Sequence, residues 1–257
     1  MNLFLRTTAL MLLMLSRAPA FAALPGDTPS LSNSKQSQNE VCPQKFKHSL
    51  TGLYGIEPFS AKVPQPYADF DVLYGKSFQA QSELEMICRQ SALHSSANTE
   101  FNGIKSKQRA WEKVQTELNN DPTQITDIAR ATIIADDIPS LVEAYEVLNR
   151  EATVVQVKNR FKAPRASGYR DLNVLVQLPK TGIIAEVQLH LSDIANVKSG
   201  PEHKIYEQVQ KIERVAAAER RDMNEWEMAK VKQLANESKS LYQAAWQPYI
   251  TTHLEAA

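Results

Sequence analysis

The stretch that decides the fold is Ile183-Ile184-Ala185-Glu186-Val187-Gln188-Leu189-His190-Leu191. Apolar and polar residues alternate along it with a period of two, which predicts a β-strand. In an extended strand Glu186, Gln188 and His190 share one face, and the apolar residues at positions 185, 187, 189 and 191 share the other. We therefore expect one face of this strand to join the core and the other to belong to a functional site.

Two stretches just before it, at 154–161 and 170–178, repeat the alternation. Their polar positions are Gln156, Lys158, Arg160, Asp171 and Asn173. If the three strands pair, they form a sheet with acids, amides and bases gathered on one face. An ordinary antiparallel sheet with one solvent-facing side also explains this pattern, but the mixture of residue types favours a site.

Helical patterns surround these strands. The spacing of apolar residues predicts helices over 77–92, 138–150 and 201–253, and an apolar strand over 127–136. Residues 42–74 contain four prolines and show no sustained period, so we expect irregular structure there. The predicted fold is of the α/β (α+β) class, with a mixed or antiparallel sheet, flanking helices and a long C-terminal helical region.

The first 22 residues are predicted to be a signal peptide. An apolar run follows Arg6, and Ala20-Phe21-Ala22 is a typical cleavage site. The run is too short to span a bilayer, which needs about 20 apolar residues, and Arg17 argues against an uncleaved membrane anchor. We therefore expect a secreted or periplasmic protein without stable membrane association after cleavage.

The remainder divides into a leader and a domain. Residues 23–40 are rich in Ser, Asn, Gln and Pro, which predicts a flexible leader. Residues 41–257 are expected to form the domain. Lys and Arg together number 29, as do Asp and Glu, so the chain has no general attraction to nucleic acid or anionic lipid.

The chain contains two cysteines, Cys42 and Cys88. An even number in an oxidising compartment permits a disulfide, but two unpaired thiols explain the sequence equally well. Neither cysteine has the spacing of a structural zinc site.

Four cations, Lys105, Lys107, Arg109 and Lys113, fall within nine residues at the start of a helix that should begin near Ser106. Cations near a helix N-terminus run against the helix dipole. A bound polyphosphate would remove this conflict, because exposed N–H groups at such an end favour phosphate. A solvated basic face is the alternative interpretation.

The order of the motifs is informative. A Lys-Ser pair opens the basic helix, Asp127 opens a strand, Gly168-Tyr169-Arg170 forms a turn, and Glu186-Val187-Gln188-Leu189 lies in the central strand. In this order the motifs resemble the synthetase domain of the RelA/SpoT family over about residues 103–207. That family transfers pyrophosphate from ATP to the 3′-hydroxyl of a guanine nucleotide. The resemblance implies a nucleotidyltransferase-like sheet, ATP and a nucleotide acceptor as substrates, and Mg²⁺ as cofactor.

The resemblance also implies roles for individual residues on the donor side. Lys105 and Lys113 match lysines that contact the donor phosphates, and the neighbouring Lys107 and Arg109 can add to this contact. Asp127 matches a magnesium ligand.

On the catalytic side, Glu186 matches a glutamate that serves as metal ligand or general base. Lys158 and Arg130 are the cations expected beside it. A carboxylate, a metal site and several cations are the groups that attack on phosphorus requires.

On the acceptor side, Tyr169 matches the tyrosine that stacks on the acceptor base. The predicted acceptor-binding set is completed by Arg170, Asn173, Gln188 and His190. For His190, a satisfied hydrogen-bonding role is the favoured alternative.

The sequence also departs from the family pattern. Gly103 stands where the family often has arginine, Arg109 where it has serine, and Asn173 where many members have histidine. Arg130 follows Asp127 by three positions rather than five. These changes indicate a divergent branch and leave the acceptor base open, and the His-Asp pair of the associated hydrolase domain is not found in the sequence.

The predicted function is transfer of pyrophosphate from ATP to the 3′-hydroxyl of GDP or GTP. The same chemistry on adenine nucleotides or on the 3′ end of tRNA, by a secreted toxin, is an alternative, although the neutral total charge does not favour tRNA. A catalytically inactive periplasmic nucleotide-binding protein is another. An activator or an immunity protein is a further expected partner.

Overall fold

The computed structural model describes residues 47–251. The predicted signal peptide, the predicted leader and Cys42 lie outside the described residues. Residues 47–251 belong to one compact unit. Within residues 47–251, no helix combines the length and the apolar character that crossing a membrane requires.

The described residues form one six-stranded sheet with the order β1-β4-β5-β6-β3-β2. The strands are β1 (Phe59–Ser60), β2 (Asn98–Glu100), β3 (Arg130–Ala135), β4 (Thr153–Asn159), β5 (Leu172–Gln177) and β6 (Ile184–Leu191). β3 and β6 run parallel, and all other neighbours run antiparallel. A mixed sheet with flanking helices confirms the predicted α/β class.

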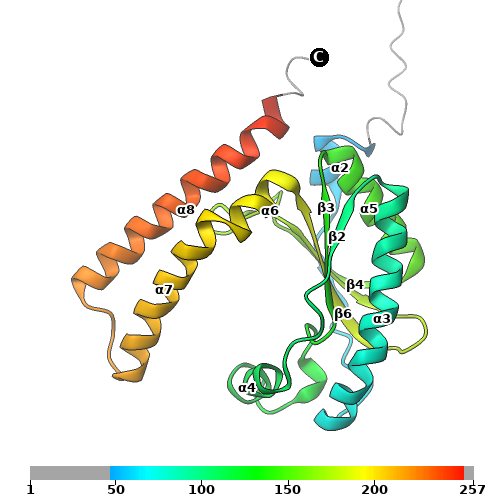
Figure 1. Ribbon diagram of the computed structural model, residues 1–257, viewed down its shortest axis with the longest axis horizontal. Helices are drawn as coiled ribbons and strands as arrows, with labels where there is room; N and C mark the ends of the chain where they lie inside the picture. The colour runs from blue at the N-terminus through cyan, green and yellow to red at the C-terminus, as the bar shows by residue number, and fades with distance from the viewer. Residues whose placement is uncertain (1–46, 252–257) are drawn as a thin grey trace, which may run out of the picture. The chain divides into compact units, whose positions relative to one another are not determined.

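Helices cover both sides of this sheet. They are α2 (Leu50–Gly55), α3 (Phe70–His94), α4 (Lys107–Glu117), the 3₁₀ turn Pro122–Gln124, α5 (Ile138–Glu151), α6 (Ser192–Ser199), α7 (Pro201–Ala218) and α8 (Glu225–Thr251). α3 and α5 pack on one face, and α6, α7 and α8 lie on the other side (Figure 1). The predicted C-terminal helical region is thus a pair of long helices that follows the short α6.

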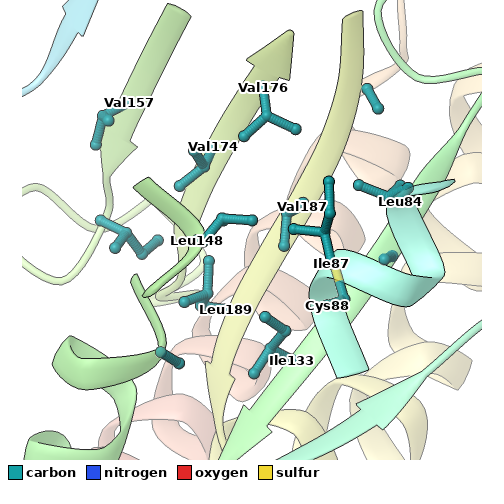
Figure 2. Packing of buried hydrophobic residues seen from close by; sticks show 14 of the residues in the cluster. Leu84, Ile87, Cys88, Ile133, Leu148, Val157, Val174, Val176, Val187 and Leu189 are labelled. Atoms are coloured by element: carbon teal, nitrogen blue, oxygen red, sulfur yellow. The ribbon is translucent and has the colours of Figure 1, made fainter. Parts of the chain in front are cut away.

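The main core lies between the sheet and the α3–α5 pair. Figure 2 shows Leu84 and Ile87 of α3 and Leu148 of α5 beside Val187 and Leu189 of β6. Full burial of an aliphatic side chain contributes roughly 1.5–3 kcal/mol. The apolar face that alternation predicted for the central strand is therefore confirmed as the core face.

α3 differs from its prediction at both its start and its buried face. It starts before position 77 because Asp69 caps it, accepting a hydrogen bond from Val72 N at 2.9 Å. The apolar pattern of residues 77–92 would include Phe78 in the buried face, but Phe78 is 58% exposed, since the buried face runs through Leu73 and Leu84. α2 and β1 also form in a region where irregular structure was expected.

A bulge in β4 breaks the predicted alternation. The register shifts between Val154 and Gln156, which leaves Val155 as an extra residue. Val155 packs against Leu175 and Ile184 in a small separate cluster instead of joining the main core. Beyond the bulge the alternation holds, and Gln156 and Lys158 lie on the face opposite α3 and α5.

Candidate active site

The sheet face opposite α3 and α5 carries an open cavity of about 560 Å³. β3, β4, β5 and β6 form its floor, and α4 and α6 each add one lysine. The charged lining residues are Glu100, Lys113, Asp127, Arg130, Lys158, Arg160, Arg165, Glu186 and Lys198. Cations outnumber carboxylates in this set, which favours a polyanionic ligand.

Glu186 is held in one orientation by two amides. Its Oε1 accepts hydrogen bonds from Asn173 Nδ2 at 2.5 Å and from Gln188 Nε2 at 2.8 Å. The pairing of β5 with β6 puts Asn173 opposite Gln188, so the register itself places both amides beside the carboxylate. Within residues 47–251, Oε2 has no such contact. A carboxylate held in this way can accept a proton or bind a metal ion.

Asp127 gathers two of the predicted donor-side lysines. Its Oδ2 accepts hydrogen bonds from Lys105 Nζ at 2.6 Å and from Lys113 Nζ at 2.9 Å. Burial alone would raise the pKa of Asp127, but the two ammonium groups outweigh it, so its pKa is lowered and the carboxylate is ionised at neutral pH. Its Oδ1 is buried and has no hydrogen-bond partner in the described part of the chain.

The other two predicted donor-side cations are not in this cavity. Lys107 forms an exposed ion pair with Asp71 at 2.7 Å, and Arg109 lies exposed in the first turn of α4. Only Lys113, in the next turn, reaches the cavity wall. The prediction that Lys107 and Arg109 contact the donor phosphates is therefore corrected. A helix directs successive residues to different sides, and neither of these two side chains lines the cavity.

Arg130 and Lys158 lie in the cavity wall as predicted for residues beside Glu186. Arg130 is opposite Glu186 in the β3–β6 register, and its Nε is buried without a hydrogen-bond partner in the described residues. Lys158 is exposed in the wall and pairs with Asn173 in the β4–β5 register. The structure thus brings these side chains together, and their catalytic roles stay predictions.

Behind the cavity, four side chains form a buried chain of hydrogen bonds. Arg160 Nη1 donates to both oxygens of Asp171, at 2.6 and 2.9 Å. The Tyr169 hydroxyl donates to Asp171 Oδ2 at 2.8 Å and lies 2.7 Å from His190 Nε2. This arrangement requires the Nε2–H tautomer of His190, because the hydroxyl proton is already given to Asp171.

The network corrects the prediction for His190. Its side chain is 1% exposed and lies behind Tyr169. Burial, with the nearby Lys198 and Arg160, holds the pKa of His190 well below its usual value, so the ring is neutral. The buried ring therefore cannot contact an acceptor nucleotide, and it takes part in the hydrogen-bond network instead.

Arg170 also differs from its prediction as an acceptor contact. Its Nη1 donates to the carbonyl oxygen of Phe161 at 2.8 Å, and its guanidinium lies 5.0 Å from the ring centroid of Trp246. Arg170 therefore ties α8 to the end of β4 and does not line the site. Cys88 is a free, buried thiol in the core, and the disulfide stays untested because Cys42 lies outside the described residues.

A second cavity, of about 460 Å³, lies between this floor and the α7–α8 pair. Tyr169 lines it with 9% of its surface exposed, opposite His203 and Tyr206 of α7. The residues that line both cavities are Arg160, Arg165, Asn173, Glu186, Gln188 and Lys198. The braced carboxylate therefore lies where the two cavities meet.

Sequence reasoning missed two of these shared cations. Arg165 lies in the loop between β4 and β5, and its guanidinium is 5.6 Å from the ring centroid of Tyr169. Lys198 comes from α6 and donates to Gln188 Oε1 at 2.8 Å. No local motif marks either residue, because both reach the floor only through the path of the folded chain.

Comparison with known proteins agrees with this geometry. A family model described as a region found in RelA/SpoT proteins matches residues 102–212. These residues are a RelA/SpoT region. The RelA/SpoT region contains β3 to β6 and every charged residue of the first cavity except Glu100. The resemblance seen in the sequence is confirmed.

One relative of known name matches half of the chain. The (p)ppApp synthetase toxin Tas1 of Pseudomonas aeruginosa (strain UCBPP-PA14) is 30% identical over 129 residues, which are 50% of this chain and 28% of that protein. The chain thus matches little more than a quarter of that relative's length.

Among solved structures, the complex between the Type VI effector Tas1 and its immunity protein is similar with 25% identity and a TM-score of 0.52, over 69% of this chain and 96% of that chain. The small alarmone synthetase 2 of Bacillus subtilis is similar with 21% identity and a TM-score of 0.49, over 70% and 92% of the respective chains.

Proposed function

We propose that the protein is an ATP:nucleotide 3′-pyrophosphotransferase. The observation that carries this proposal is the position of Glu186, a carboxylate braced by two amides where a cation-rich cavity meets a second cavity. Transfer between two nucleotides needs a site for the donor polyphosphate, a site for the acceptor and a base between them. The cavities and Glu186 supply these three parts.

In the proposed reaction, the oxygen of the acceptor 3′-hydroxyl attacks the β-phosphorus of ATP. A new oxygen–phosphorus bond forms, and the bond from the β-phosphorus to the oxygen that bridges it to the α-phosphorus breaks. AMP leaves with that oxygen, and the hydroxyl proton passes to Glu186. The cations of the first cavity bind the phosphate oxygens and offset the charge that develops on them.

Mg²⁺ is the proposed cofactor, and Asp127 is the residue that would hold it. Asp127 is ionised, and its buried Oδ1 lacks a partner among the described residues. No cluster of three or more His, Cys, Asp or Glu side chains within residues 47–251 forms a complete metal site. Mg²⁺ does not need one, because one or two carboxylates, substrate phosphates and water complete its shell. Glu186, the other predicted metal ligand, is proposed instead to accept the hydroxyl proton. When bound, the ion neutralises charge on phosphate oxygens.

The proposed acceptor is a free purine nucleotide, with GDP or GTP as the first candidate. An adenine nucleotide is the second candidate, because the relative with 30% identity is named as a (p)ppApp synthetase and because this chain departs from the family pattern at Gly103 and Asn173. The 3′ end of tRNA is not favoured, since the chain carries no net positive charge.

The predicted signal peptide supports a further proposal about where the protein acts. ATP is scarce outside cells, so an exported enzyme of this kind would act in a target cell as a toxin. The similar protein Tas1 is described as a toxin, and its solved structure includes an immunity protein. We therefore propose that an immunity protein or an activator is a partner of this chain.

A transfer assay tests the proposed function. Protein starting at Ala23 is incubated with Mg²⁺ and γ-labelled ATP against GDP, GTP, AMP, ADP and tRNA, with Glu186→Gln as control. Label should appear on one acceptor, and loss of the base should lower kcat about 100-fold or more. A folded protein that binds nucleotide but labels no acceptor would favour an inactive nucleotide-binding protein, or an enzyme that needs the proposed activator.

A further inference from the structure

Lys198 is a half-buried lysine of the first cavity, and the reaction described above gives it no role distinct from that of the other cations. It lies in the last turn of α6, which turns back over β6. Its Nζ donates to Gln188 Oε1 at 2.8 Å, and Gln188 Nε2 donates to Glu186 Oε1 at 2.8 Å. Lys198 is therefore two hydrogen bonds away from the proposed base.

The position of Lys198 differs from that of the other cations. Asp127 and Lys113 lie at the first cavity only, and His203 lies at the second only, whereas Lys198 lines both. Arg160 also lines both, but a buried aspartate holds its guanidinium, and Arg165 is exposed. A group in contact with the Lys198 ammonium lies where a phosphoryl group must pass from donor to acceptor.

The charge of Lys198 is only partly balanced. No ion pair joins it to a carboxylate within residues 47–251. Asp171 is paired with Arg160, and the hydrogen bonds to Glu186 come from two amides. Burial lowers the pKa of Lys198, although Asp171, Glu186 and Glu100 attract its proton from a distance. A lysine in the last turn of a helix also interacts favourably with the helix dipole, but that interaction does not require the side chain to be buried over the sheet. An incompletely balanced cation in a cavity favours an anionic ligand.

Building on the proposed function, we propose that Lys198 is a catalytic residue whose ammonium binds the pyrophosphoryl group as it passes between the two substrates. Gln188 takes one of its three N–H groups and orients the ammonium. Two N–H groups remain for phosphate oxygens. Such a contact strengthens as charge develops on the oxygens, so it acts on the rate more than on ground-state binding.

Three substitutions separate this role from a purely positioning one. Lys198→Gln keeps an N–H donor for Gln188 but removes the charge, Lys198→Met removes both, and Lys198→Arg keeps both. Lys211→Gln, an exposed lysine of α7 outside both cavities, is the matched control. Thermal unfolding of each variant checks that it folds.

We expect kcat to fall about 100-fold or more in both uncharged variants, with KM for ATP and for the acceptor changed little and with partial recovery in Lys198→Arg. Near-normal kcat in Lys198→Gln, or a loss confined to KM, would overturn the proposal. If the wild-type protein transfers nothing, the proposed function fails on its own account, and binding then decides the role of Lys198. A purine nucleoside with diphosphates at both the 5′ and 3′ positions should bind about tenfold more weakly to Lys198→Gln than to wild type. Equal affinity would remove the phosphate contact.

Discussion

Replacing Tyr169 by phenylalanine tests the buried network behind the second cavity. The hydroxyl donates to Asp171 Oδ2 at 2.8 Å and lies 2.7 Å from His190 Nε2. Phenylalanine keeps the ring and removes the hydroxyl. His190, which is 1% exposed, then has a buried N–H without its partner, while Asp171 keeps its two bonds from Arg160. The substitution should therefore destabilise the fold without opening a large cavity.

The magnitude follows from these contacts. A buried polar group left without its hydrogen bond costs about 1–3 kcal/mol, and a bond to a charged acceptor contributes about 1.5–3 kcal/mol. Because Asp171 remains paired, we expect a total loss of about 3 kcal/mol in the free energy of unfolding. For a domain of this size, that loss corresponds to a fall in Tm of about 6–12 °C.

Urea unfolding followed by tryptophan fluorescence measures this loss. Tyr206→Phe is the control, because Tyr206 is 53% exposed and its substitution should change stability by less than about 0.5 kcal/mol. The double variant Tyr169→Phe/His190→Leu should recover part of the loss, since it removes the unpaired group. A Tyr169→Phe protein as stable as wild type would refute the network.

The same position separates stability from the predicted stacking role. Tyr169→Phe retains an aromatic face at the second cavity and should keep most of its acceptor affinity. Tyr169→Ala removes that face and should weaken acceptor binding more than donor binding, by about 1–3 kcal/mol of stacking free energy. Unchanged acceptor affinity in Tyr169→Ala would exclude stacking on this ring.

Two further predictions follow from the donor side and the core. Lys105→Met should weaken binding of a non-hydrolysable ATP analogue about tenfold, because Lys105 is 14% exposed and holds Asp127. Lys107→Met should have almost no effect, because its ion pair is solvent-exposed, and equal losses in the two variants would contradict the assignment. In a Cys42→Ser background, Cys88 should not react with a thiol reagent at pH 8 until the protein unfolds. Its pKa is raised to about 12, mainly by burial and secondarily by a nearby glutamate, so the thiolate that reacts is scarcely populated; rapid labelling of the native protein would disprove this.

The strand pattern was predictable because its physical cause is local. Alternate side chains of an extended chain must point to opposite faces, so the sequence alone placed Glu186 and His190 on the polar face of β6. It could not show what covers that face. Glu186 opens to a cavity, whereas Tyr169 and Tyr242 pack over the region of His190 and close it. Residues on one predicted face therefore have different functions.

The sequence was also a poor guide to the positions of two lysines. Lys105, Lys107 and Lys113 are close in sequence, and the basic run pointed to phosphate binding, yet the direction of α4 takes Lys107 to an exposed aspartate. Lys198 had no such signal, because its approach to Gln188 depends on α6 turning back over the sheet. The basic run therefore overstated the role of Lys107, and no pattern in the sequence indicated the role of Lys198.

The arrangement of charges around the floor explains how a cation-rich site can exist before substrate binds. Asp127 holds two lysines at one end, and Asp171 holds Arg160 at the other. Partly buried ion pairs of this kind contribute little net stability, because desolvation offsets their attraction. What they supply is orientation, which lets the site meet developing charge without rearranging. Between the two pairs, Glu186 and Lys198 have no ion-pair partner among the described residues, and these are the groups that a transferred phosphate and a proton would meet.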